Sequence, residues 1–326
     1  MTNPVRPIAK PVIAVAPMMA WTDTHCRYLH RLYAPDALLF TEMVTANALI
    51  HGGQWQQLDY HTAEHPVALQ LGGNEPSALA LCAKQAERRG YDEINLNVGC
   101  PSSRVQQGTF GACLMKQPQL VADCIAAMQD VVSIPVTVKC RLGVDDYDSD
   151  ALLHDFVGRL SRVGMQRVYL HMRKAILGGL SPAQNRSIPP LQPERARHLK
   201  ETFPELEVIA NGGITSVAQA DEHLQWADGV MIGRAAYHNP EFLTALQQRY
   251  LGHEDGLARD EILQKYCAYI RVKLAAGERL NAMTRHMLHS CNGVRGARRF
   301  RQVLSNAKRL KAGDVSILDE ALAQVA

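Results

Sequence analysis

The sequence has 326 residues, of which 47% are hydrophobic and 21% are charged, and this composition is typical of a globular enzyme with one large domain and a smaller one. No apolar run is long enough to span a membrane and no secretory leader precedes the first predicted strand, so we expect a cytoplasmic protein without a membrane partner. The eight cysteines include no C-x-x-C pair and no Cys/His cluster with zinc spacing, which argues against a disulfide framework and predicts no metal site.

Short apolar runs alternate with helix-length segments over the first 250 residues. The eight runs span residues 12–18, 37–44, 66–73, 93–100, 135–143, 167–173, 207–213 and 229–236. Ser77 and Ser216 are the expected N-caps of two of the intervening helices, while the segment after the second run is short and broken by glycine. Eight strand–helix units of this length favour a closed (β/α)8 TIM barrel over an open sheet, so we predict an α/β fold with a barrel domain over residues 1–250.

Beyond residue 250 the predicted strands stop, and helix-like segments predict a small all-α helical bundle over residues 251–326. From Gly256 onward there are 13 Lys and Arg against 6 Asp and Glu, although the net charge of the whole chain is only +3. Residues 295–311 contain seven basic side chains and no acidic one. Such a segment is either a surface for nucleic-acid phosphates or a solvated helix face, and the residues alone leave both open.

The carboxyl ends of the predicted strands carry the residues that chemistry would need, because barrel enzymes place their sites there. Asn211, Gly212 and Gly213 end the seventh run, and Gly233 and Arg234 end the eighth. Two glycine turns at these places favour a phosphate site, in which backbone N–H groups approach the ligand. The alternative is that the glycines only permit tight turns.

Three further strand ends carry polar side chains at a similar level: Gln70, Lys139 and His171. An inward-facing lysine in a barrel needs an anionic partner, and a reduced flavin ring would be one. Period-two alternation alone does not decide which way Lys139 faces. A histidine such as His171, taken by itself, is more often a satisfied core residue than a ligand contact.

The stretch "NLNVGCPSSR" ends an apolar run with Asn97, a glycine, Cys100 and a proline. A buried structural cysteine does not need that setting, which suggests a thiol presented to a ligand, but the residues alone leave open that Cys100 is a small core residue like most free cysteines. A free thiol is mostly protonated at neutral pH, so Cys100 could act as a proton donor.

Several fragments in order along nearly the whole chain, among them "VAPMMAWTD", "INLNVGCPS", "NGGI" and "MIGRAAYHNP", resemble the tRNA-dihydrouridine synthases, and their A-type branch in particular. The resemblance implies a flavin-binding barrel followed by a helical tRNA-binding domain. It implies FMN as cofactor, NADPH as reductant, and reduction of the C5=C6 bond of D-loop uridines, at positions 20 and 20a for this branch. The target base would be flipped out of its stack into the barrel mouth. We expect a monomer acting on tRNA.

The resemblance also assigns residues by matching motifs. Cys100 matches the catalytic proton donor, and Asn97 lies where the family positions the uracil. The expected flavin contacts are Pro17, Met18, Met19, Gln70, Lys139, His171, Asn211, Gly212, Gly213, Gly233 and Arg234. The expected contacts to substrate and tRNA, besides Asn97, are Arg173, Arg186, Arg298 and Arg301.

Two positions depart from the family pattern. Ala20 stands where this branch usually has Asp, and Ser103 stands where an acid commonly follows "CPS". Both departures concern the geometry of the loops around the site rather than a group assigned to chemistry.

Two competing functions remain open on the residues alone. A flavin barrel that reduces a small enone or pyrimidine explains the strand ends but not the basic segment. A non-catalytic RNA-binding protein explains the basic segment, but not Cys100, Lys139 and the glycine turns together.

Overall fold

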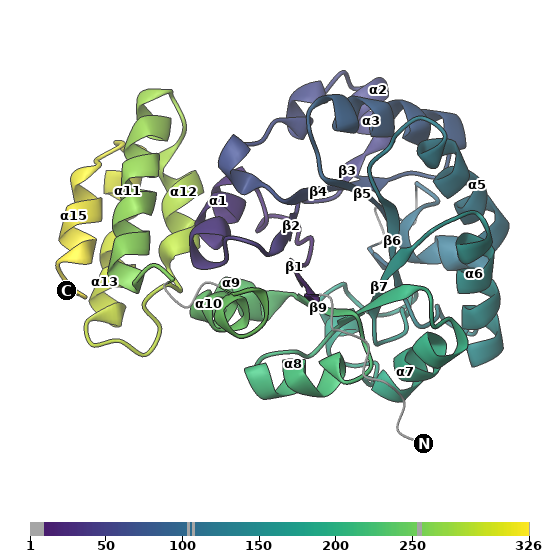
Figure 1. Cartoon of the computed structure of the whole chain (residues 1–326). Coiled ribbons are helices and arrows are strands. Elements are labelled where there is room, and N and C mark those ends of the chain that lie inside the picture. The colour runs from purple at the N-terminus through teal and green to yellow at the C-terminus, as the bar shows by residue number, and fades with distance from the viewer. Residues whose placement is uncertain (1–9, 103–104, 106–107, 253–255, 326) are drawn as a thin grey trace.

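The computed structural model describes residues 10–102, 105, 108–252 and 256–325. All the strand pairings of its sheet are parallel. The strands are β1 (Val12–Val15), β2 (Leu38–Phe40), β3 (Val44–Thr45), β4 (Val67–Gly72), β5 (Glu93–Val98), β6 (Val136–Arg141), β7 (Arg167–His171), β8 (Glu207–Asn211) and β9 (Gly229–Ile232). β1 pairs with both β2 and β9, and β2 pairs with β4, so eight of the strands close a ring (Figure 1). The predicted TIM barrel is confirmed.

The second predicted run divides into two strands. β2 ends at Phe40, and the chain rejoins the sheet at β3, whose two residues pair with Leu71 and Gly72 at the carboxyl end of β4. Residues 41–43 thus leave the sheet at the level where the other strands end, and Met43 reaches the cavity described below.

Helices cover the outside of the ring (Figure 1). They are α1 (Thr24–Tyr33), α2 (Ala46–Ile50), α3 (Pro76–Arg88), α5 (Pro118–Gln129), α6 (Asp150–Arg162), α7 (Pro193–Thr202), α8 (Val217–Leu224), α9 (Arg234–His238) and α10 (Glu241–Leu246). The connecting segments contain the short turns η1 (Trp55–Leu58), η2 (Thr62–Glu64), η3 (Gly111–Lys116), η4 (Gln184–Arg186) and η5 (Gln247–Leu251). The five-residue α2 agrees with the weak helix signal after the second run.

The two predicted N-caps have different outcomes. Ser216 accepts a hydrogen bond from the Gln219 N–H at 3.3 Å and caps α8, as predicted. Ser77 does not cap α3, because the helix begins one residue earlier, at Pro76. Proline is favoured in the first helical position, where its missing N–H leaves no bond unmade.

The barrel interior differs from the layer between strands and helices. On β6, Val136, Val138 and Cys140 belong to the large outer core, whereas Thr137 and Lys139 face the barrel interior. There Thr137 bonds to Glu93 on the neighbouring β5, and Lys139 bonds to Asn211 on β8. A second, smaller apolar cluster fills part of the interior with Ala14, Ala16, Leu38, Phe40, Ala68, Tyr169, Ile209 and Met231. Alternation along each strand therefore separates an apolar outer face from an interior that is partly polar.

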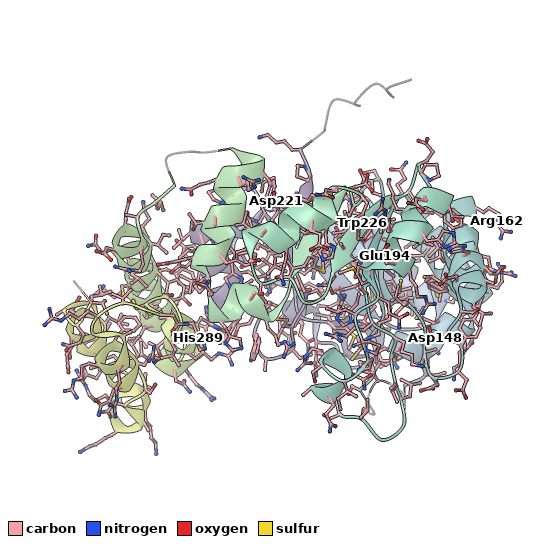
Figure 2. All side chains as sticks on the ribbon, turned by 90° about the horizontal axis from the view of Figure 1, so that it is seen from below. Asp148, Arg162, Glu194, Asp221, Trp226 and His289 are labelled. Carbon is pink, nitrogen blue, oxygen red and sulfur yellow. The ribbon has the colours of Figure 1, made fainter. Side chains whose placement is uncertain are left out.

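A helical bundle follows the barrel. It comprises α11 (Arg259–Ala275), α12 (Leu280–Met287), α13 (Ala297–Leu304), α14 (Ala307–Lys311) and α15 (Ser316–Leu322). The bundle lies against α1, where Tyr28 stacks on Tyr269 with ring centroids 3.9 Å apart and His25 Nδ1 lies 2.8 Å from the Tyr269 hydroxyl. Figure 2 shows the bundle, which carries His289, on one side of the barrel, with Arg162 on the opposite side.

Asp23 adds a polar contact between the two parts. Its carboxylate caps α1 by accepting from the Cys26 N–H and also pairs with Arg285 and His286 of α12. In the described part of the chain, no helix is long and apolar enough to cross a membrane.

Candidate active site

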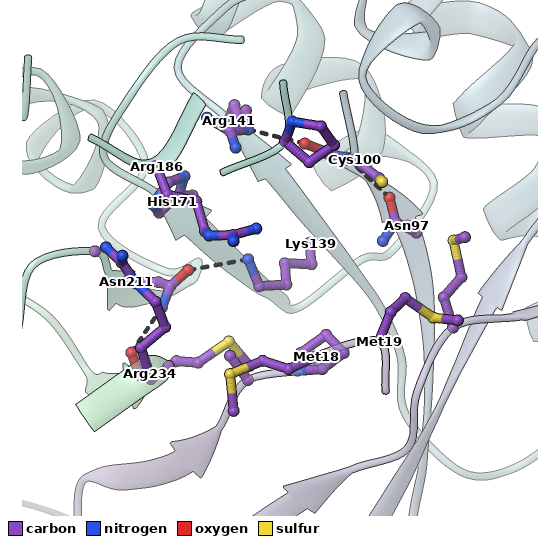
Figure 3. A pocket seen from close by; sticks show the side chains of 18 of the residues that line it. Met18, Met19, Asn97, Cys100, Lys139, Arg141, His171, Arg186, Asn211 and Arg234 are labelled. Carbon is purple, nitrogen blue, oxygen red and sulfur yellow. Dashed lines mark hydrogen bonds between the residues drawn. The ribbon is translucent and has the colours of Figure 1, made fainter. Parts of the chain in front are cut away.

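A cavity of about 420 Å³ opens at the carboxyl ends of the strands, and this volume lies within the range of small-ligand sites. Fourteen of the predicted site residues line it: Pro17, Met18, Met19, Gln70, Asn97, Cys100, Lys139, His171, Arg186, Asn211, Gly212, Gly213, Gly233 and Arg234. Residues from opposite ends of the barrel sequence meet here, and Figure 3 shows Met18 and Met19 across the cavity from Arg141.

Lys139 faces into the barrel, which settles the orientation that alternation left undecided. Its Nζ donates to Asn211 Oδ1 at 2.9 Å, and the Asn211 amide donates in turn to the Met231 carbonyl at 2.7 Å (Figure 3). Burial lowers the pKa of Lys139 to about 8, and the neighbouring Arg141 adds to this effect. The ammonium group therefore lies in the site without a full counter-charge.

The cavity is cationic. Lys139, Arg141, Arg186 and Arg234 line it, and the described lining residues include no Asp or Glu. Burial lowers the pKa of Arg186, and Arg234 lowers it further. Burial, together with the cations Arg141, Lys139, Arg173 and Arg186, holds the pKa of His171 well below its ordinary value, so its ring is neutral at pH 7. The site is thus built to receive an anionic ligand.

The glycines after β8 are required by the backbone. Gly212 and Gly213 have φ of +120° and +74°, in the region that favours glycine. A Cβ on Gly212 would lie 2.9 Å from the His171 ring, and one on Gly213 would lie 2.5 Å from Leu191. Turn geometry alone accounts for the glycines, while their position in the cavity wall beside Arg234 also suits a bound phosphate.

Cys100 is held by its backbone at the cavity wall. Asn97 Oδ1 accepts from the N–H groups of Gly99 and Cys100 at 3.2 and 3.0 Å. On the other side, Arg141 Nε donates to the Gly99 carbonyl at 2.8 Å. Burial raises the pKa of the Cys100 thiol, against the opposing effect of the Ser102 N–H and nearby cations. Cys100 therefore carries its proton at neutral pH.

Three predicted residues lie outside the lining of the cavity. Arg173 turns to the loop after β7, where its guanidinium donates to the Pro189 carbonyl and its Nε has no partner among the described residues. Arg298 and Arg301 lie on α13 in the bundle, and Arg301 donates to Asn292 Oδ1 at 3.2 Å. Ser103, one of the two departures, lies outside the described residues.

The cavity also contains residues that sequence reasoning did not assign to it, among them Trp21, Met43, Arg141 and Pro182. The signal for Arg141 was present, because it lies two positions after Lys139 on one strand and so shares its face. Trp21 stacks on Tyr237 of α9 with ring centroids 4.5 Å apart. Ala20, the other departure, has φ of +62° in the loop between Met19 and Trp21, a conformation that favours Gly, Asn or Asp.

The described residues contain no group of three or more His, Cys, Asp or Glu side chains that could hold a metal ion. The closed parallel barrel and the acid-free cationic cavity with its adjoining thiol define an α/β-barrel enzyme that handles an anionic ligand at its strand ends.

Comparison with known proteins narrows this class. Residues 14–326 match the family described as Dihydrouridine synthase (Dus), and the chain belongs to that family. It is 51% identical to a tRNA-dihydrouridine(20/20a) synthase of Vibrio vulnificus (strain CMCP6), over 96% of each chain. It is 53% identical to a tRNA-dihydrouridine(20/20a) synthase of Escherichia coli (strain K12), over 96% of this chain and 91% of the relative.

A solved structure of morphinone reductase shares the fold. It has a TM-score of 0.53 at 14% sequence identity and covers 74% of this chain and 91% of its own. The same enzyme in complex with tetrahydroNAD has a TM-score of 0.51 at 13% identity, covering 77% of this chain and 89% of its own.

Proposed function

We propose that this protein is a tRNA-dihydrouridine synthase that uses FMN and NADPH to reduce the C5=C6 bond of uridines 20 and 20a in the D-loop. The observation that carries the proposal is the protonated thiol of Cys100 in the wall of an acid-free cationic cavity. The two relatives named above support the tRNA substrate and the positions.

The residues in the cavity fit a flavin mononucleotide. Gly212, Gly213 and Arg234 suit its phosphate, since glycine backbone and a guanidinium line the same wall. The half-buried ammonium of Lys139 suits the negative charge of a reduced ring. Gln70 and His171 would contact the ring and ribityl chain, and Pro17 to Met19, with Asn211 and Gly233, complete the expected contacts. A bound flavin, once NADPH had reduced it, would supply the hydride that C6 of the uracil accepts.

The chain itself supplies the proton and holds the base. Cys100 donates its proton to C5, because its thiol is neutral at physiological pH and its loop is fixed from both sides. Asn97 lines the cavity next to that loop and is the residue expected to position the uracil. Arg186 lines the cavity near Cys100, and its guanidinium suits the negative charge that develops on the base. Arg173, which was also expected to contact the substrate, does not line the cavity.

The test is an anaerobic absorbance experiment on wild type and Cys100→Ala. We expect both proteins to hold a flavin that NADPH bleaches. Unmodified tRNA should reoxidise the wild type and do so at least ~100-fold more slowly in Cys100→Ala, because the general acid is gone. Cys113→Ala is the matched control, since that half-buried thiol donates to the Phe110 carbonyl and does not line the cavity.

Other outcomes would overturn parts of this assignment. Reoxidation of Cys100→Ala at the wild-type rate would remove its role as proton donor. A flavin that free enones reoxidise and tRNA does not would favour a small-molecule reductase. A folded protein that takes up no flavin but binds tRNA would favour a non-catalytic RNA-binding protein. Mapping dihydrouridine in the product tRNA tests positions 20 and 20a.

A further inference from the structure

A chain of side-chain hydrogen bonds runs through the barrel interior from the cavity toward the amino end of β5. Asn97 Nδ2 donates to Gln70 Oε1 at 2.8 Å, and Gln70 Nε2 donates to Asn95 Oδ1 at 2.8 Å. Asn95 Nδ2 donates to Thr137 Oγ1 at 2.9 Å, and the Thr137 hydroxyl donates to Glu93 Oε1 at 2.6 Å. Every donor points the same way, and the carboxylate of Glu93 is the final acceptor.

The register of the barrel brings these residues together. Gln70 on β4 lies beside Asn95 on β5, and Asn95 lies beside Thr137 on β6. All five side chains in this series of hydrogen bonds are buried, and Asn95 is completely inaccessible to solvent. Buried amides that lack a partner are costly, so each group is held in the orientation that its neighbour allows.

Glu93 is set up to accept and not to donate. Its other oxygen, Oε2, receives Arg167 at 2.9 Å and the Tyr169 hydroxyl at 3.1 Å. Burial raises the pKa of Glu93, while Arg167 and the hydrogen bonds from Thr137 and Tyr169 favour its ionised form. Three donors thus converge on one carboxylate that the proposed chemistry does not use.

Glu93 fixes the polarity of the whole chain through Thr137. A hydroxyl has one proton, and Thr137 donates it to Glu93. Thr137 can therefore only accept in its hydrogen bond with Asn95. The alternative acceptor, the Ile94 carbonyl, lies 3.3 Å away, beyond the usual O–H···O distance. The order of donors then carries through Asn95 and Gln70 to Asn97, whose Oδ1 is left facing the N–H groups of Gly99 and Cys100.

The geometry points to Glu93 as a positioning residue that orients the Asn97 amide, and with it the Cys100 loop, from the opposite end of the barrel interior. For its activity readout this inference rests on the proposed function. A neutral amide at position 93 would present its oxygen to Arg167 and Tyr169 and its NH2 to Thr137. Thr137 would then donate to Asn95, and reversal along the chain would turn the Asn97 NH2 toward two backbone N–H donors.

The test is Glu93→Gln in the flavin-loaded protein, with two readouts. Hydrogen exchange at the Gly99 and Cys100 amides, followed by NMR with 15N-labelled glycine and cysteine, should accelerate about tenfold, the equivalent of one net hydrogen bond. Uridine reduction should slow by about tenfold or more, because a misplaced donor loses its alignment. Flavin content and the rate of reduction by NADPH are measured alongside, because reversal of the hydrogen bonds also turns the Gln70 amide, which is expected to face the flavin.

Glu207→Gln is the matched control. Glu207 accepts from Arg167 Nε at 2.6 Å, so this variant also removes a carboxylate beside Arg167, but it leaves the chain intact. Both readouts should match the wild type. Unchanged exchange at Gly99 and Cys100 in Glu93→Gln would overturn the inference.

A second pair of variants keeps the test decisive if Glu93→Gln does not fold. Thr137→Val keeps the shape of the side chain but removes the hydroxyl, and it should accelerate exchange as Glu93→Gln does. Thr137→Ser restores the hydroxyl and should restore slow exchange, which a role in packing alone would not predict. Equal exchange in the Val and Ser variants would overturn the inference. If the wild type reduces no uridine in tRNA, the proposed function is wrong. The exchange rates of the Gly99 and Cys100 amides would still test whether Glu93 orients Asn97.

Discussion

Lys139 illustrates how a single side chain can prepare a site for an anion. Its half-buried ammonium has Asn211 as its hydrogen-bond partner, and burial lowers its pKa to about 8. Enclosure disfavours the charge, and a ligand with negative charge restores it. Lys139 therefore lowers the stability of the free protein, and binding of an anionic ligand offsets this loss.

The pH dependence of flavin binding follows from this arrangement. An anionic ligand favours protonated Lys139, so binding takes up a proton near pH 8, and the affinity for FMN should fall as pH rises through about 8. Lys139→Met should bind more weakly at pH 7 and lose this dependence. Calorimetric titration from pH 6.5 to 9 in buffers of different ionisation enthalpy measures both effects. Parallel profiles for the two proteins would refute the assignment.

The same lowered pKa has a consequence for the free protein. The ordinary value for lysine is 10.5, so between about 8 and 10.5 the folded protein binds fewer protons than the unfolded chain. Its free energy of unfolding should gain a contribution from Lys139 as pH rises through that window. Denaturation of the flavin-free wild type and Lys139→Met across the window isolates this contribution.

At the scale of elements, one guanidinium holds three loops together. Arg141, at the end of β6, donates to the Gly99 carbonyl after β5, to the Lys174 carbonyl after β7, and to the Asn185 carbonyl in η4 at 2.8, 3.1 and 3.0 Å. Its planar fork reaches all three acceptors at once, which a lysine ammonium at the same place would not do. The loop of Cys100 is thus held by two side chains: Arg141 binds the Gly99 carbonyl, and Asn97 binds the N–H groups of Gly99 and Cys100.

Replacement of this clamp should separate loop geometry from cofactor binding. We expect Arg141→Lys to keep its flavin and its reduction by NADPH, while reoxidation by tRNA slows by roughly 10- to 100-fold. Stopped-flow absorbance measures the two half-reactions separately. Arg159→Lys is the control, because Arg159 makes an exposed pair with Asp155 on α6, and it should behave as wild type. Wild-type reoxidation in Arg141→Lys would show that the loops do not depend on this contact.

The alternation of runs and helices was sufficient to predict the barrel, since each unit carries its own pattern. The glycine turns, Lys139, His171 and Cys100 could be placed at one end because parallel strands share their direction. Arg173 shows where this reasoning stops: its position at a strand end is clear from the sequence, but its contact with Pro189 depends on a loop path that no periodicity encodes. The role of Glu93 depends on register between strands, which the sequence of one strand does not contain.

At the scale of the whole molecule, positive charge lies both in the cavity and on the bundle. The two are held in fixed relation by Asp23 with Arg285 and His286, and by the stack of Tyr28 on Tyr269. The basic segment 295–311 offers less free charge than its seven residues suggest, because Arg309 pairs with Asp314 and Glu320. Arg298, by contrast, is exposed on α13.

Removal of the charges on α13 should weaken tRNA binding without touching the flavin site. For Arg298→Ala with Arg301→Ala, we expect lower affinity for tRNA and a slope of log K against log salt that is smaller by about two, one for each lost phosphate contact. Filter binding at several salt concentrations measures both. Arg309→Ala is the matched control and should leave the slope unchanged. An unchanged slope in the double variant would place the tRNA elsewhere.

The pairing of β1 with β9, and of α1 with the bundle, bears on how the chain is made. During synthesis the first strand and first helix leave the ribosome early, but the partner strand of β1 ends at Ile232 and the helices that cover α1 extend to Met287. An unpaired strand edge and an uncovered helix face therefore persist through most of translation, a state prone to association with other chains. The barrel can therefore close only after Ile232 has left the ribosome, and α1 is covered only after the helices up to Met287 have followed.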